Sequence, residues 1–148
     1  MRVWRLTKPD YAPGLDGEGA RLWGGRWNST GLAVVYTSGS LALAALEYFI
    51  HLPAAMRQPG RLPPLVAVAL DVPDDVRLEI RASLPGDMTA SRNVGDNWIR
   101  GKDSLGLIVP SFVIPHDTNL LLNPAHPDMR RITVGLTAPF TFDPRLAS

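Results

Sequence analysis

Short apolar runs alternate with proline- and glycine-rich breaks along the whole chain. Most of these runs are rich in β-branched, leucine or aromatic residues, which is typical of strands; they cover residues 3–6, 32–37, 65–70, 76–80, 105–109, 119–122, 132–134 and 140–142. One run, Leu41–Leu52, has helical spacing instead, follows the potential capping residue Ser40 and stops before Pro53. The pattern predicts an α+β fold for residues 1–148: a single compact domain with antiparallel-rich sheets and few helices, of which only this one is clear.

Composition narrows the classes of function. The chain has 148 residues with a formal net charge of +1 from 15 basic and 14 acidic side chains, which provides no broad field for nucleic acid or an anionic membrane. The absence of cysteine excludes disulfides, a thiol nucleophile and cysteine-ligated metals. Met1–Leu6 lacks a signal-peptide core, and the longest charge-free run, 27–46, contains polar residues and glycines. We therefore expect a cytoplasmic protein that binds neither membrane nor nucleic acid directly.

Glu47 is the strongest single candidate for chemistry. It is the only acidic side chain between positions 26 and 57, and it lies in the apolar helical run, where a carboxylate is costly unless it has a purpose. An ordinary alternative is a helical i,i+4 contact with His51, and the same two residues could form half of a metal site. The remaining histidines, His116 and His126, lie in proline-rich loops without ligand-like spacing, so no metal is expected.

Three further residues are weaker candidates when each is taken alone. Arg26 follows two glycines, so its guanidinium could grip a phosphate or carboxylate, although a pairing with a surface acid is the commoner case. Tyr36 could stack on a flat ring or could be a core residue with a solvated hydroxyl. Ser111, between Pro110 and Phe112 in an apolar run, could direct its hydroxyl into a cleft or bond to backbone.

The order of short motifs along the chain is more informative than any single residue. The motifs are Gly24-Gly25-Arg26-Trp27-Asn28-Ser29, Val34-Val35-Tyr36-Thr37, Leu43-Ala44-Ala45-Leu46-Glu47, Gly95-Asp96-Asn97-Trp98, Val109-Pro110-Ser111-Phe112-Val113-Ile114-Pro115 and Asn119-Leu120-Leu121-Leu122-Asn123-Pro124-Ala125-His126-Pro127. This series resembles the RES domain, which is named for its arginine, glutamate and serine, over nearly the whole chain. The resemblance implies an ADP-ribosyltransferase-like fold and the toxin of a bacterial toxin–antitoxin pair that consumes NAD⁺ or transfers ADP-ribose.

By that resemblance, Arg26, Tyr36, Glu47 and Ser111 form the active-site set, and Arg26, Tyr36 and Asn119 contact the NAD⁺ substrate. The implied partner is a DNA-binding antitoxin of the Xre type, and a homodimer within their complex is compatible with the family. The segment around Phe112 and His116 is expected to vary.

The chemistry of NAD⁺ suits this set of residues. Breaking the nicotinamide–ribose bond expels a neutral base from a pyridinium cation, so one carboxylate suffices where glycosidases use two. Glu47 would bind a ribose hydroxyl and stabilise the oxocarbenium-like charge, or would deprotonate the nucleophile. Arg26 would hold the pyrophosphate or an acceptor phosphate, Tyr36 would stack on nicotinamide or ribose, and Ser111 would orient Glu47 or the nicotinamide side.

Two other classes of function stay open at this point. The chain could be a non-catalytic module in which Arg26 recognises an anionic or protein partner, or a metal-dependent hydrolase that uses Glu47 and His51. A dinucleotide-binding G-x-G-x-x-G turn is missing, which argues against hydride transfer on a Rossmann domain. No residue pattern indicates whether the acceptor is water, phosphate or a protein.

Overall fold

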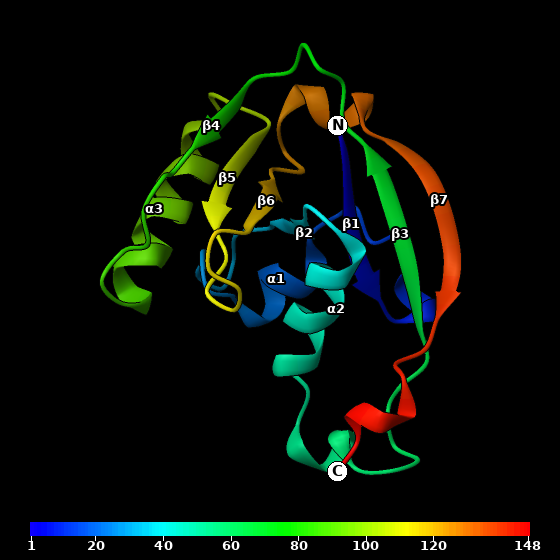
Figure 1. Cartoon of the computed structure of the whole chain (residues 1–148). Coiled ribbons are helices and arrows are strands. Elements are labelled where there is room, and N and C mark those ends of the chain that lie inside the picture. Colours follow the sequence, from blue (N-terminus) through cyan, green and yellow to red (C-terminus); the bar gives the residue numbers. More distant parts are fainter.

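A seven-stranded sheet organises the computed structural model, which describes residues 1–148 (Figure 1). Its strands are β1 (Arg2–Thr7), β2 (Val35–Ser38), β3 (Leu65–Asp71), β4 (Leu78–Ile80), β5 (Gly106–Pro110), β6 (Thr118–Leu122) and β7 (Thr133–Phe140). The α-helices are α1 (Glu18–Trp23), α2 (Leu41–Ile50) and α3 (Met88–Gly101). The strand order is β4-β5-β6-β2-β1-β3-β7, and only β4 and β5 pair in parallel. The predicted antiparallel-rich α+β fold is confirmed.

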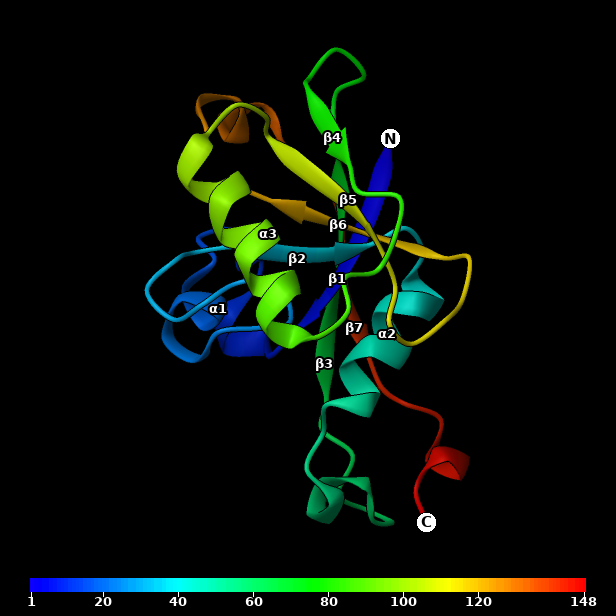
Figure 2. The same ribbon diagram turned by 90° about the vertical axis from the view of Figure 1, so that its left-hand side faces the viewer.

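The sheet consists of two halves that meet at one point. β1 and β2 pair only through Trp4 and Ser38, whereas β1 pairs with β3 along its full length. Figure 2 shows the consequence: β1 and β3 run nearly upright, while β2 and β6 cross them at a steep angle. The two halves therefore diverge beyond the contact between Trp4 and Ser38.

The two longer helices cover the same face of the sheet, one on each half. α3 packs on the β5–β6 half through an apolar cluster that includes Trp98, Leu107 and Leu121. α2 packs near β1 and β3, where Leu6 and Leu65 belong to a second cluster. The strand pairings place these clusters on one face, because directly paired residues point the same way. The junction between the two halves of the sheet therefore lies between α2 and α3.

The start of α2 agrees with the sequence prediction. The Ser40 hydroxyl accepts a hydrogen bond from the backbone N–H of Leu43 at 3.1 Å, as expected of a helix cap. The helix ends at Ile50, before the predicted stop at Pro53. None of the helices in the structure is both long enough and apolar enough to cross a membrane.

The prediction of a single clear helix was wrong, because α3 is the longest helix of the chain. Its sequence is polar and carries a glycine at its middle, and Asp87 caps it by accepting from the N–H of Ala90 at 2.8 Å. Gly95 is required by packing: a Cβ there would lie 1.6 Å from the carbonyl oxygen of Trp27. The propensity penalty of this glycine hid a helix that tertiary contact stabilises.

Strand boundaries needed three corrections, one of which is that the strand expected at 76–80 covers only Leu78–Ile80. The runs 132–134 and 140–142 were expected to be separate strands, but β7 is continuous from Thr133 to Phe140 because it pairs along β3, with a bulge opposite Ala69 and Leu70. The strand expected at 32–37 begins only at Val35, where pairing with β6 starts.

Candidate functional site

A cleft of about 900 Å³ opens where β1 and β2 diverge. Four of the five residues singled out in the sequence border it: Arg26, Tyr36, Glu47 and Asn119. The fifth, Ser111, is 5% exposed and lies behind the cleft wall, in contact with Glu47. The fold thus brings together residues that are up to 93 positions apart, from Arg26 to Asn119.

The Glu47 carboxylate is held through one of its two oxygens. Oε1 accepts from the Ser111 hydroxyl at 2.8 Å and from the Asn119 amide nitrogen at 2.7 Å. The Asn119 side chain is itself oriented by the Ser38 hydroxyl, which donates to its Oδ1 at 2.8 Å. Oε2 has no hydrogen-bond partner within the protein, so this oxygen is available to a ligand in the cleft.

Ser111 has contacts on two sides. Besides donating to Glu47, its hydroxyl oxygen accepts from the backbone N–H groups of Val113 at 3.0 Å and Ile114 at 3.1 Å. These bonds fix the turn that follows β5, so the position of the Glu47 carboxylate and the shape of this loop are tied together. Of the two roles considered for Ser111, the geometry favours orientation of Glu47.

His51 also borders the cleft, but its ring contacts the backbone of Glu47 and not its carboxylate. The His51 ring nitrogen Nδ1 lies 2.8 Å from the backbone carbonyl oxygen of Glu47, an ordinary contact at the end of a helix. The ordinary i,i+4 alternative is thus seen as a contact of the ring with the backbone of Glu47.

Arg26 is held by its backbone and by an aromatic ring. Its carbonyl oxygen accepts from the Ser91 hydroxyl at 2.5 Å, and the carbonyl of Gly25 accepts from Arg92 Nε at 2.9 Å, both from α3. The guanidinium carbon lies 4.2 Å from the centroid of the Phe112 ring. Arg26 takes part in none of the ion pairs of the chain. The alternative of a surface acid as its partner is thereby excluded, and its donors can serve an anionic ligand.

Tyr36 connects strand β2 to the motif at residues 24–29, which contains Arg26. Its hydroxyl donates to Asn28 Oδ1 at 2.7 Å and accepts from the N–H of Trp27 at 3.1 Å. Burial raises the pKa of the Tyr36 hydroxyl, so it stays neutral at ordinary pH. A Cβ on Gly25 would come within 2.6 Å of this hydroxyl, which explains the second glycine of the motif.

Asn28 and Asp96, from two of the sequence motifs, make hydrogen bonds that fix the segment around Arg26. Asn28 is fully buried, and its amide nitrogen lies 2.9 Å from the carbonyl of Ala20 and 3.0 Å from that of Leu32. Asp96 of α3 accepts from both the N–H and the hydroxyl of Ser29, at 2.8 and 2.6 Å. The predicted motifs around Asn28 and Asp96 therefore hold Arg26 in place from two sides.

Sequence reasoning missed two more basic residues that border the cleft, Arg5 and Lys8. The Arg5 Nε is buried and has no hydrogen-bond partner. Burial lowers the pKa of Arg5, and the nearby charge of Asp16 opposes this effect. A cation in a strand between Trp4 and Leu6 was the signal that could have identified Arg5.

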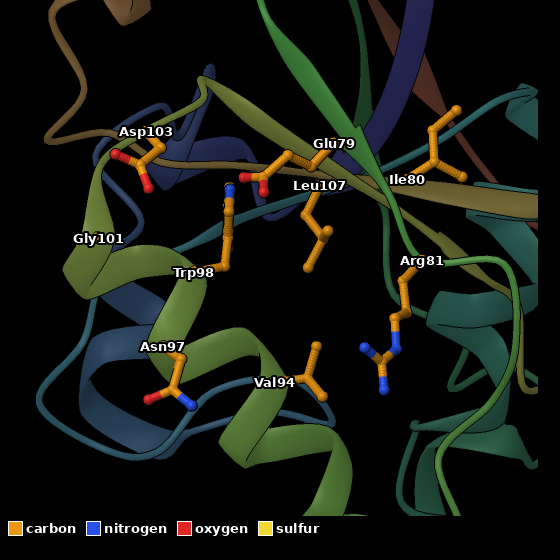
Figure 3. A pocket seen from close by; sticks show the side chains of 9 residues that line it. All are labelled: Glu79, Ile80, Arg81, Val94, Asn97, Trp98, Gly101, Asp103 and Leu107. Atoms are coloured by element: carbon orange, nitrogen blue, oxygen red, sulfur yellow. The ribbon is translucent and has the colours of Figure 1, made fainter.

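A second, smaller cavity of about 300 Å³ lies between α3 and the edge strand β4 (Figure 3). Figure 3 shows Glu79, Trp98 and Leu107 around the same space, on β4, α3 and β5. Glu79 Oε2 accepts from the Ser104 hydroxyl at 2.6 Å, and Ser104 accepts from the Trp98 indole N–H at 3.0 Å. None of the predicted site residues borders this cavity.

Comparison with known proteins places these features in a family context. The model of the RES domain family matches residues 2–143. The "Prs ADP-ribosylating toxin" of Sphingobium sp. (strain YBL2) is 37% identical, over 97% of this chain and 94% of that protein. A "Toxin Res" of Yersinia enterocolitica is 31% identical, over 99% of both chains.

A solved structure supports the fold independently. The crystal structure of the M. tuberculosis MbcT–MbcA toxin–antitoxin complex contains a chain that matches 99% of this one, with 86% of that chain covered, a TM-score of 0.69 and 19% identity. At that level of identity the likeness concerns the fold alone.

Proposed function

The chain belongs to the RES domain family, and we propose that it is the toxin of a toxin–antitoxin pair that cleaves the nicotinamide–ribose bond of NAD⁺ in the cytoplasm. One observation carries the proposal: the Glu47 carboxylate is fixed through Oε1, its Oε2 has no partner in the protein, and Glu47 borders a cleft that three basic residues also border. A cleft of about 900 Å³ lies within the range of ligand pockets, roughly 300–1,000 Å³.

Glu47 is proposed to stabilise the transition state. As nicotinamide leaves as a neutral base, positive charge develops on the ribose carbon and ring oxygen, and a nearby carboxylate lowers the energy of that charge. Oε2 would accept a hydrogen bond from a ribose hydroxyl, while Ser111 and Asn119 prevent the carboxylate from turning away. With water as acceptor, the products are nicotinamide, ADP-ribose and one proton.

The basic residues are proposed to bind the anionic part of the substrate. The Arg26 guanidinium, free of ion pairs, has donors that match two phosphate oxygens at once. Arg5 borders the same cleft and would add a second cation for the pyrophosphate. Tyr36 would place its ring against nicotinamide or ribose, and Asn119 would complete the wall around the ribose.

The molecule that accepts the ADP-ribosyl group is a separate part of the proposal. The Sphingobium relative is named as a toxin that ADP-ribosylates Prs, so Prs is our first candidate for a protein acceptor, beside water and inorganic phosphate. Transfer to a protein would replace water by a nucleophilic side chain, with the ADP-ribosyl group bonded to that side chain and nicotinamide again released.

A protein inhibitor is proposed because uncontrolled NAD⁺ loss would harm the host cell. The chain of known structure that shares this fold comes from a toxin–antitoxin complex. We propose an Xre-type, DNA-binding antitoxin for this chain. The simplest inhibition is steric, with an acidic segment of the antitoxin in the cleft near Arg26.

Product analysis by mass spectrometry tests the proposal. The purified chain is incubated with NAD⁺ in buffer alone, with inorganic phosphate, and with purified Prs. Free nicotinamide in every arm is expected, and the mass of the ADP-ribosyl product identifies the acceptor. Unchanged NAD⁺ in all three arms would favour the non-catalytic binding module, and loss of turnover on adding a chelator would favour the metal-dependent hydrolase.

A further inference from the structure

Phe112 belongs to the loop that contacts both the Arg26 guanidinium and the Glu47 carboxylate. Its ring lies 4.2 Å from the guanidinium carbon of Arg26, and its centroid is 5.9 Å from that of the buried Trp27 ring. The preceding residue is Ser111, which donates to Glu47 and fixes the loop through two backbone N–H groups. Two adjacent residues of one loop therefore contact the carboxylate and the guanidinium.

The contact with Phe112 leaves the N–H donors of Arg26 without a partner in the protein. A guanidinium that lies over an aromatic ring uses its flat face, whereas its five N–H donors point outward from its edge. The backbone contacts from Ser91 and Arg92 fix only where the Arg26 side chain begins. No polar side chain holds the guanidinium, so the Phe112 ring is what restricts its long, flexible side chain.

We propose that Phe112 is a positioning residue that holds Arg26 for the pyrophosphate of the dinucleotide and thereby sets the affinity for NAD⁺. The inference rests on the proposed function and adds to it a residue at a position that was expected to vary. Phe112 is 36% exposed, so its replacement should cost little core packing.

A double-mutant cycle tests this role. Phe112→Leu keeps an apolar side chain without a ring face, and Phe112→Tyr keeps the ring. We expect Phe112→Leu to raise KM for NAD⁺ and the Kd of ADP-ribose by roughly fivefold, the size of an aromatic–cation contact, with kcat within about twofold. Phe112→Tyr should restore both constants. In the Arg26→Ala background, Phe112→Leu should have no further effect.

Two controls separate the outcomes. The Kd of nicotinamide, which has no phosphate, should be the same in all variants, and so should the melting temperature within a few degrees. An equal effect of Phe112→Leu with and without Arg26, or no effect on KM and Kd, would overturn the positioning role while leaving the proposed function intact. Failure of the unchanged chain to consume or bind NAD⁺ would reject the proposed function and this role together.

Discussion

The chain contains two glutamates that each accept a hydrogen bond from a buried or nearly buried serine, in two different regions. In the cleft, Ser111 donates to Glu47 at 2.8 Å; beside α3, Ser104 donates to Glu79 at 2.6 Å. The bonds are alike, but the surroundings differ: Glu47 borders a cleft of about 900 Å³ with three basic residues, and Glu79 borders a cavity of about 300 Å³ with one, Arg81, beside the Ser104–Trp98 contact. A serine–glutamate pair alone is thus no evidence of a reaction; its neighbours decide.

The largest difference between the two regions is expected from removing each negative charge. Glu47→Gln keeps the shape and should lower kcat at least about 100-fold with little change in NAD⁺ affinity, because the charge acts mainly on the transition state. Glu79→Gln is the matched control and should leave kcat within about twofold. Steady-state nicotinamide release measures both. Equal rates in the two variants would remove the distinction between the regions.

The next largest effect is expected from changing the cations near each glutamate. Arg26→Lys keeps the charge but loses the two-pronged geometry and the guanidinium that lies against Phe112, so KM for NAD⁺ should rise about tenfold. Arg81→Lys, at the edge of the smaller cavity, should change neither KM for NAD⁺ nor kcat. Titration of ADP-ribose by calorimetry gives the affinities directly; wild-type affinity in Arg26→Lys would exclude a bidentate role.

Removing the two serines should separate activity from stability. Ser111→Ala deletes one donor to Glu47 and the anchor of the following loop, and should lower kcat by roughly fivefold to tenfold. Ser104→Ala leaves the buried Trp98 indole N–H unpaired and should cost about 1–3 kcal/mol of unfolding free energy without affecting kcat. Urea unfolding and kinetics on the same samples compare them. If Ser104→Ala lowers kcat as much as Ser111→Ala, the effects are merely structural.

The smallest expected effect concerns alkaline pH. The folded-state pKa of Tyr36 is raised above its ordinary value of 10.0, so the stability that it contributes is complete below pH 10 and decreases as the pH rises further. Tyr36→Phe should therefore weaken the fall in unfolding free energy above about pH 10. The Trp98 indole does not titrate, so Trp98→Phe should leave that slope unchanged. Urea unfolding at several pH values gives the unfolding free energy as a function of pH for both variants. A slope that is the same in Tyr36→Phe as in the unchanged protein would contradict this role of Tyr36.

Sequence reasoning named residues that the fold brings together at the candidate site, but it missed one of the elements that support them. Glu47 could be found because a carboxylate in an apolar helix is conspicuous, and Ser40 marked where that helix begins. The contact of Ser111 and Asn119 with one oxygen of Glu47 could not be read from spacing, because it depends on β5 and β6 being paired next to β2. The segment around Phe112 was expected to vary, and its contact with Arg26 could not be predicted because it joins two loops.

The same limit explains why α3 was missed. Its apolar residues are few, and Gly95 lowers its intrinsic helix propensity. The reason for that glycine is a close approach to Trp27, a contact between segments almost 70 residues apart. Local sequence signals could not show it.

The most direct test of the account is nicotinamide release from NAD⁺ by the purified chain, followed by mass spectrometry for the unchanged protein, Glu47→Gln and Glu79→Gln. Nicotinamide and a matching ADP-ribosyl product are expected from the unchanged protein and from Glu79→Gln, and almost none from Glu47→Gln. Undiminished release from Glu47→Gln, or none from the unchanged protein, would contradict it.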